Sequence, residues 1–297
     1  MATSIRQWVG DALTLFLLPA FVAMLPYGLG FRLLKMLARR ARAFRAEAAT
    51  ACAAASEHVD VVDAPTWQFR FRLLLWVERA DVFLVLMRSD RWWRRHVAVT
   101  GQWPDAAGGH IFLTYHWGAG FWIMRFLRRG GFRPWFLVRR HEARDFGQTR
   151  LARWIGGLRG WVLSRTGSRG LIYTGRSSER IRELLSTGGS VLGMLDLPAR
   201  PKQRVQSVSL LDAYARLPDG LARLAVDSNS RVTLISCGLD FERGLRELRI
   251  EPLPRSSAVE ILRNYARHLD SRLRTSPESW IMWREACAIF ENSQPSE

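Results

Sequence analysis

HIFLTYHWGAGFW, at residues 110–122, is the stretch of sequence that sets the fold class. Its apolar run at 111–115 predicts a buried strand, and the glycines after His116 predict a turn into a helix over 117–129. Uninterrupted apolar strands are typical of parallel sheets, which helices cover on both faces. The stretch therefore predicts an α/β unit.

The same alternation continues along the chain. Further short apolar runs predict strands at 135–138, 171–173, 191–195, 232–237 and 248–250. Helical spacing predicts helices at 67–87, 149–166, 179–185, 218–227 and 258–272. Pro218 would occupy the first turn of its helix, and Ser257 and Glu260 would form a capping box. We expect an α/β domain over 46–292, with a mainly parallel sheet flanked by helices, and a frayed tail at 293–297.

The N-terminal region carries a long apolar stretch. Residues 12–31 contain no charge, and about 20 apolar residues suffice to cross a bilayer. We therefore predict a membrane-anchoring helix within residues 1–45, followed at 32–45 by a basic amphipathic helix suited to an anionic leaflet. Pro19 and Pro26 leave open a bent or re-entrant segment, and a buried core helix is the alternative without a membrane. The basic residues that follow predict a domain on the cytoplasmic face.

The charge indicates an anionic partner. The chain has 44 Lys+Arg against 27 Asp+Glu, a net charge of +17, and all but two of the basic residues are arginines. Twelve arginines against two acids give residues 123–170 a net charge of +10, which suits phosphorylated headgroups, although a solvated helix face explains most of them. Nucleic acid is disfavoured, because no helix-turn-helix, zinc or RNA-binding signature occurs. The cysteine spacing and the lack of a phosphate loop predict neither a metal site nor a bound cofactor.

His116 is the candidate catalytic residue. Ligands of open α/β sheets bind at the carboxyl ends of strands, where the sequence places this imidazole. A helix N-terminus beside the ring would keep it neutral and able to accept a proton, and Gly118 and Gly120 would let a substrate approach the backbone. Surface positions are expected for four other histidines: His58, His96, His110 and His268. His141, after Arg139 and Arg140 at the end of the next strand, would line the same cleft.

The order of these motifs resembles a known family. WFLVRR (135–140) and RGLIYTGR (169–176) follow the His116 strand, and then come GGSVLGMLDLPA (188–199), LPDGLARLAVDSNSRVTLISC (217–237) and PESWIMWREACAIF (277–290). This series resembles the lipid A biosynthesis lauroyl/myristoyl acyltransferases of the lysophospholipid acyltransferase superfamily, over nearly the whole chain. The family signature is His-x4-Asp/Glu, but Phe121 stands where the acid should be. The acid that orients His116 would then come from Asp196, Asp145 or Glu142, or be missing.

The resemblance implies an acyltransferase that moves a fatty acyl group from an acyl-carrier-protein or coenzyme A thioester to a hydroxyl or amine of a lipid or glycolipid. His116 would be the general base, Arg139 or Arg140 would stabilise the oxyanion or hold a phosphate, and the expected place is the cytoplasmic face of a bacterial inner membrane. Aromatic side chains would line a groove for the acyl chain or belong to the core: Trp117, Phe121, Trp122, Phe126, Phe132 and Trp135. A lipid-binding relative without activity is the main alternative.

Overall fold

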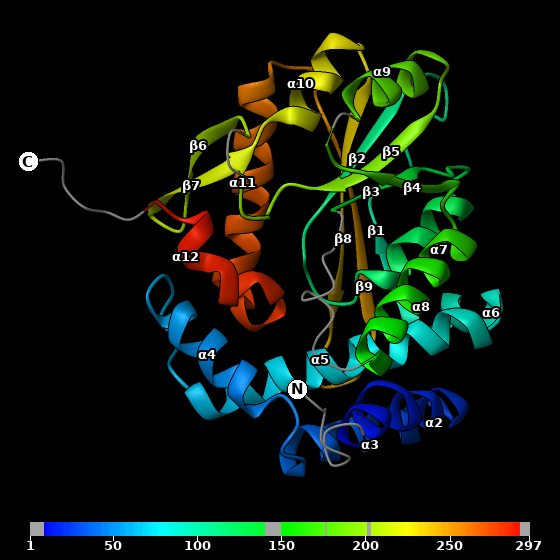
Figure 1. The fold of residues 1–297 in the computed structure, drawn as a ribbon, viewed down its shortest axis with the longest axis vertical. Helices are drawn as coiled ribbons and strands as arrows, with labels where there is room; N and C mark the ends of the chain where they lie inside the picture. The colour runs from blue at the N-terminus through cyan, green and yellow to red at the C-terminus, as the bar shows by residue number, and fades with distance from the viewer. Residues whose placement is uncertain (1–8, 140–149, 176, 201–202, 292–297) are drawn as a thin grey trace, which may run out of the picture.

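A seven-stranded, mostly parallel sheet forms the centre of the molecule (Figure 1). The computed structural model describes residues 9–139, 150–175, 177–200 and 203–291. The strands are β1 (Val97–Thr100), β2 (His110–Thr114), β3 (Trp135–Val138), β4 (Gly170–Tyr173), β5 (Ser190–Met194), β8 (Arg231–Leu239) and β9 (Arg246–Leu253). Their order is β1-β9-β8-β2-β5-β3-β4, and among these described strands β8 and β9 form the antiparallel pair, while the other neighbours are parallel.

All six predicted strands are present, but three further strands were not predicted. β1 has only one buried residue, and its short apolar run, Val97 to Val99, directly follows an arginine-rich helix. The hairpin of β6 (Val205–Leu210) and β7 (Ala213–Pro218) alternates polar and apolar residues and pairs outside the main sheet. The prediction that Pro218 begins a helix is wrong: this proline ends β7, and the helix that follows starts at Gly220.

Helices cover both faces of the sheet, as predicted. They are α4 (Arg45–Ser56), α5 (Ala64–Met87), α6 (Asp90–His96), α7 (Phe121–Arg129), α8 (Arg150–Thr166), α9 (Ser178–Ser186), α10 (Gly220–Asp227), α11 (Ala258–Thr275) and α12 (Ala286–Ile289). Two turns of 3-10 helix, η3 (Pro277–Ser279) and η4 (Ile281–Glu285), precede α12. β2 shows the layering, because Ile111 and Leu113 pack in one core with α9, α10 and α11, while Phe112 packs in a second core with α7 and α8.

Residues 12–31 form a bent helical segment, the form that Pro19 and Pro26 left open, and not one straight apolar helix. The segment consists of η1 (Ala12–Leu17), α2 (Leu18–Met24) and the start of α3 (Tyr27–Arg40), with extended backbone at Leu25. The break follows from Pro26, which disfavours helical geometry at the residue before it. Within the described residues, no helix combines the length and the apolar character needed to cross a membrane.

The N-terminal helices share a core with the rest of the chain. α2 and α3 lie against α5, at the end of the molecule opposite α9 and α10 (Figure 1). Phe31 and Leu34 of α3 pack in one buried cluster with Trp76 of α5 and with Leu239 and Phe241 at the end of β8. The carboxyl ends of the five strands that run in the same direction as β8 therefore face this helical layer; they are β2, β3, β4, β5 and β8.

Candidate functional site

His116 and Asp196 meet where two neighbouring strands end. Thr114 of β2 pairs with Met194 of β5, and each candidate residue lies two positions beyond its strand. The parallel register therefore brings His116 and Asp196 side by side. The imidazole Nδ1 lies 3.0 Å from Asp196 Oδ1, and the His116 backbone N–H donates to Asp196 Oδ2 at 2.7 Å.

The Asp196 carboxylate is completely buried and has three donors and one further polar neighbour. Besides the two groups of His116, the Trp280 Nε1–H donates to Oδ2 at 2.8 Å, and the Tyr265 hydroxyl lies 3.3 Å from Oδ1. Burial alone raises the pKa of a carboxyl group. Here the His116 imidazole and the hydrogen bonds from His116 and Trp280 outweigh burial and hold the pKa of Asp196 below its usual value. The carboxylate is therefore ionised at neutral pH.

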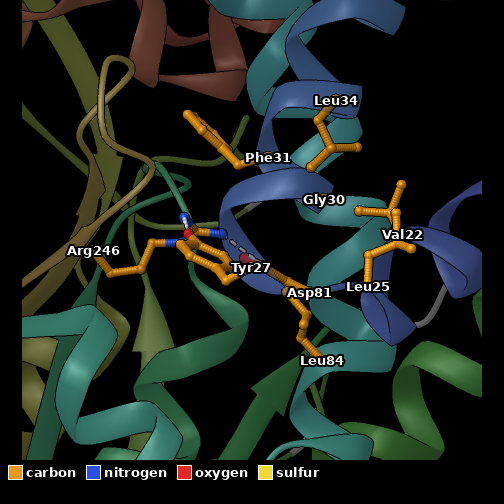
Figure 2. Close-up of a pocket in the computed structure, with 9 residues that line it drawn as sticks. All are labelled: Val22, Leu25, Tyr27, Gly30, Phe31, Leu34, Asp81, Leu84 and Arg246. Carbon is orange, nitrogen blue, oxygen red and sulfur yellow. Dashed lines mark hydrogen bonds and ion pairs between the residues drawn. The ribbon is translucent and has the colours of Figure 1, made fainter.

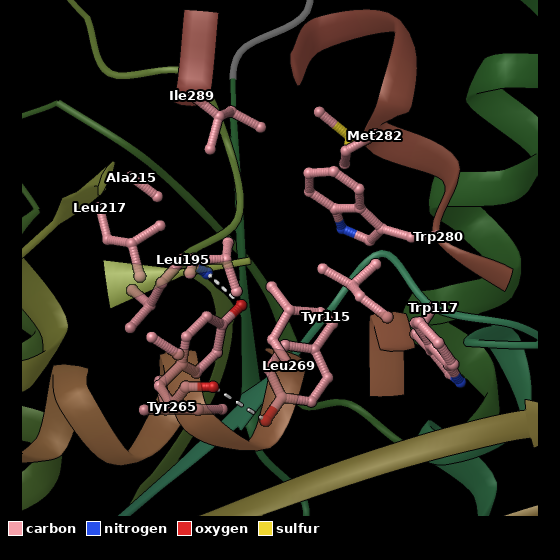
Figure 3. Close-up of a cluster of buried hydrophobic side chains, with 14 of the residues drawn as sticks. Tyr115, Trp117, Leu195, Ala215, Leu217, Tyr265, Leu269, Trp280, Met282 and Ile289 are labelled. Carbon is pink, nitrogen blue, oxygen red and sulfur yellow. Dashed lines mark hydrogen bonds between the residues drawn. The ribbon is translucent and has the colours of Figure 1, made fainter. Parts of the chain in front are cut away.

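Tyr265 ties the two strand ends together. Its hydroxyl accepts from the backbone N–H groups of Leu195 and Asp196 at 3.2 and 3.1 Å, and it lies 2.9 Å from the Thr114 carbonyl. The ring packs against Tyr115 in the buried cluster that also holds Trp280 (Figure 3). The position of Asp196 is therefore fixed from three elements: β5, α11 and the segment after η3.

This arrangement can perform general base chemistry. Because Asp196 is an ionised acceptor, it selects the tautomer in which His116 carries its proton on Nδ1, so Nε2 is the nitrogen that can take up a proton. The same carboxylate stabilises the imidazolium that forms when Nε2 is protonated. The His116 side chain is 24% exposed, whereas the Asp196 side chain is inaccessible. A substrate can therefore reach the imidazole but not the carboxylate.

The turn after His116 differs from the prediction. α7 begins at Phe121 rather than at residue 117, so the charge beside the imidazole is the Asp196 carboxylate and not a helix N-terminus. Gly118 adopts a positive φ of 56°, and a Cβ there would lie 2.3 Å from the Cys237 carbonyl oxygen. The space beside Gly118 is therefore filled by β8 and not open to a substrate. At Gly120 an added Cβ would meet nothing within 4 Å.

The aromatic residues near His116 belong mostly to the core. Trp117 and Phe121 are 4% and 6% exposed, and the Trp122, Phe126 and Phe132 side chains are also buried. Of the two expectations for these five residues, a groove for the acyl chain or the core, the structure shows their side chains packed in the core. The apolar residues on α7 recur at helical spacing because this face of the helix packs against the sheet, as in any helix that covers a sheet.

Arg139 lies at the same sheet edge as His116. It follows β3, which is separated from β2 by β5, so the two backbones are roughly 10 Å apart, twice the strand spacing. Its side chain is exposed. Arg140 and His141 lie outside the described residues, as do the other two candidate acids, Glu142 and Asp145.

His110 is not at the surface as expected. It is 1% exposed at the start of β2, with Nε2 2.9 Å from the Thr233 hydroxyl and its ring stacked on Phe112. Burial, helped by the charge of Arg231, lowers the pKa of His110 to about 4. This histidine is therefore a neutral core residue.

No protein-family model matches the chain, and no curated protein matches it. Within the described residues, no cluster of three or more His, Cys, Asp or Glu side chains could hold a metal ion.

A second polar cluster lies buried between α3, α5 and β9. Arg246 pairs with Asp81 at 2.8 Å and donates to the Tyr27 hydroxyl at 2.9 Å, and both charged side chains are 1% exposed. A cavity of about 10 Å³ lies between these polar side chains and apolar residues of α2, α3 and α5 (Figure 2). This space is barely enough for one water molecule, so the cluster is a structural ion pair and not a substrate site.

Two residues that contact Asp196, namely Trp280 and Tyr265, were not predicted from the sequence to belong to the site. Trp280 lies in the segment 277–290, which was noted only because it resembles a segment of the family. The sequence pattern of α11 places Tyr265 at an ordinary apolar position. Both are amphipathic aromatics that need a polar partner when buried. That requirement is the signal that could have suggested a buried acceptor near them.

Proposed function

We propose that this protein is a membrane-associated acyltransferase in which His116 is the general base and Asp196 its orienting acid. The observation that carries the proposal is the His116–Asp196 contact at the carboxyl edge of the sheet, with the carboxylate buried and the imidazole accessible. This pair supplies the base and the acid that the His-x4-Asp/Glu signature would supply, although Phe121 occupies the signature position.

The proposed reaction transfers an acyl group from a thioester to a hydroxyl or an amine. His116 Nε2 removes a proton as the acceptor oxygen or nitrogen attacks the thioester carbonyl. The tetrahedral intermediate collapses as the carbon–sulfur bond breaks, and the imidazolium returns the proton to the leaving thiolate. The products are the acylated acceptor and a free thiol. Asp196 stays ionised throughout and stabilises the imidazolium between the two proton transfers.

The charges suggest the reaction partners. The excess of arginine favours an acyl carrier protein or coenzyme A as donor, because both are anionic, and a lipid or glycolipid with a phosphate as acceptor. Arg139, or Arg140 beside it, is proposed to hold that phosphate or the oxyanion. We place the protein on the cytoplasmic face of a bacterial inner membrane, with the helices of residues 12–40 at the lipid surface in place of a spanning anchor.

A non-catalytic lipid-binding protein is the alternative, because Phe121 replaces the signature acid. The experiment that separates the two compares lipid extracts by mass spectrometry. A deletion strain is complemented with wild type, with His116→Ala or with His110→Gln. The last is the control, because His110 is a buried histidine at the opposite end of β2 from His116. An acylated lipid that wild type and the control restore, and His116→Ala does not, supports the acyltransferase. Equal restoration by His116→Ala contradicts it.

A further inference from the structure

The N-terminal helices expose a continuous apolar ridge. The ridge consists of Val9, Leu13, Leu17, Phe21 and Met24, which are between 42% and 59% exposed. Their spacing of three or four residues places the last four on one side of η1 and α2, and Val9 lies one turn before η1. The opposite side, with Pro19, Val22 and Ala23, is buried against α5. The ridge therefore faces away from the body of the protein.

Two tryptophans on α8 extend this apolar surface. Trp154 and Trp161 are 55% and 47% exposed and lie seven residues apart, which is two helical turns. Trp154 contacts Phe16 of η1, with ring centroids 5.7 Å apart, and Phe16 lies between the ridge residues Leu13 and Leu17 on η1. Phe16 also packs on Phe83 of α5, with ring centroids 5.4 Å apart, so Trp154 lies beside η1 and next to the ridge, from a segment far away in the sequence.

Basic side chains border this surface. α3 packs one side against α5, as α2 does, and its exposed outer residues include Leu29, Arg32, Met36, Arg39 and Arg40. On α8 the Arg165 guanidinium lies 4.9 Å from the centre of the Trp161 ring. Exposed tryptophans and aliphatic side chains next to arginines match the boundary between lipid headgroups and acyl chains.

We propose that this surface docks in one leaflet of an anionic lipid bilayer, with η1 and α2 lying in the membrane plane. A second copy of the chain fits less well, because two copies that each carry +17 and a basic rim would repel one another. An anionic leaflet satisfies the apolar ridge and the basic rim together. The inference deepens the proposed function, since it names the surface that meets the lipid phase, but vesicle binding needs no catalysis.

The test measures co-sedimentation of the full chain with vesicles of phosphatidylethanolamine and phosphatidylglycerol. The double substitution Leu17→Glu/Phe21→Glu acts at side chains that are already about half exposed, so the fold is retained. It should weaken vesicle binding roughly tenfold or more, because two apolar side chains leave the lipid and two acids enter. The matched control is Val62→Glu/Tyr214→Glu, which adds the same charge at side chains that are 90% and 62% exposed elsewhere on the molecule.

The control should bind within about twofold of wild type, because it leaves the ridge intact and its two acids lie away from the lipid surface. The loss of net positive charge is the same in both variants, so a difference between them reports the ridge. Binding of wild type should also fall on vesicles of phosphatidylcholine alone. His116→Ala should bind as wild type does, so a failure of catalysis and a failure of docking can be distinguished. Three results would overturn the proposal: no binding of wild type, equal binding by the ridge variant and the control, or a vesicle-free dimer that the ridge variant dissociates.

Discussion

At the scale of single residues, the site depends on which acid lies beside His116. The sequence offers three carboxylates, Asp196, Asp145 and Glu142, and nothing in local spacing ranks them. The register of β2 with β5 places Asp196 against the imidazole, and this pairing is a tertiary property. Of the candidate site, His116 and its place at the strand end were predictable. Tyr265 and Trp280 were not, because their role exists only once Asp196 is buried between them.

We expect Trp280 to be a positioning residue. Trp280→Phe removes the donor to Asp196 Oδ2 and should slow acyl transfer by roughly 10- to 100-fold, the effect of losing a hydrogen bond of about 1.5–3 kcal/mol to a charged group. Trp283→Phe is the matched control, because this neighbouring buried indole donates to the Pro277 carbonyl and not to the site.

The measurement is kcat and KM over a range of pH for both variants. Trp280→Phe should lower kcat and change its pH profile, while KM changes little. Trp283→Phe should leave the pH profile as in wild type. If both variants lower kcat equally and leave the profile unchanged, Trp280 has only a packing role.

At the scale of elements, the sequence predicts the strands that consist of apolar runs and misses strands in which polar residues are interspersed. β2, β5 and β8 were found because each is a short apolar run buried on both faces. β3, β4 and β9 were found from short, mostly apolar runs, although only part of each strand is buried. The β6–β7 hairpin was missed because it alternates polar and apolar residues, and β1 was missed because its short run directly follows an arginine-rich helix. The apolar stretch at 12–31 has the composition of a membrane span. In the structure Pro26 divides it into helices that pack on α5.

The turn between β2 and α7 has a specific requirement for glycine. Gly118→Ala should lower the free energy of unfolding by about 2 kcal/mol or more, because the new Cβ meets the Cys237 carbonyl and the left-handed backbone disfavours alanine. Gly120→Ala, two residues later, has ordinary φ and open space and should change it by less than about 0.5 kcal/mol. Urea unfolding checks both, and equal losses would contradict the account of this turn.

At the scale of the whole molecule, the N-terminal helices and the sheet form one structure through a buried ion pair. Asp81 of α5 and Arg246 of β9 are enclosed together, and Arg246 also contacts the Tyr27 hydroxyl of α3. Charge counting did not predict this, because 42 arginines look alike in sequence. The net charge of +17 now has two proposed uses, the rim of a lipid-facing surface and the attraction of anionic substrates.

We expect Arg246→Met to cost about 3–5 kcal/mol of the free energy of unfolding, because Asp81 is left buried without its partner. Asp81→Leu/Arg246→Met should recover much of that loss, since neither charge remains. Burial already raises the pKa of Asp81 to about 6, and losing Arg246 raises it further. A carboxyl group with a raised pKa destabilises the fold as pH rises, so the single variant should lose more stability at pH 8 than at pH 5. Denaturant unfolding at both values would contradict this account if the loss did not depend on pH.

The central claim is that His116, oriented by Asp196, is the base of an acyl transfer. The most direct measurement is the initial rate of thiol release and acceptor acylation by wild type, His116→Ala and Asp196→Asn in native membranes supplied with an acyl thioester. We predict a loss of about 10³-fold or more for His116→Ala and a comparable loss for Asp196→Asn, which removes the buried negative charge but keeps the side-chain shape. Transfer by both variants at the wild-type rate would contradict the claim.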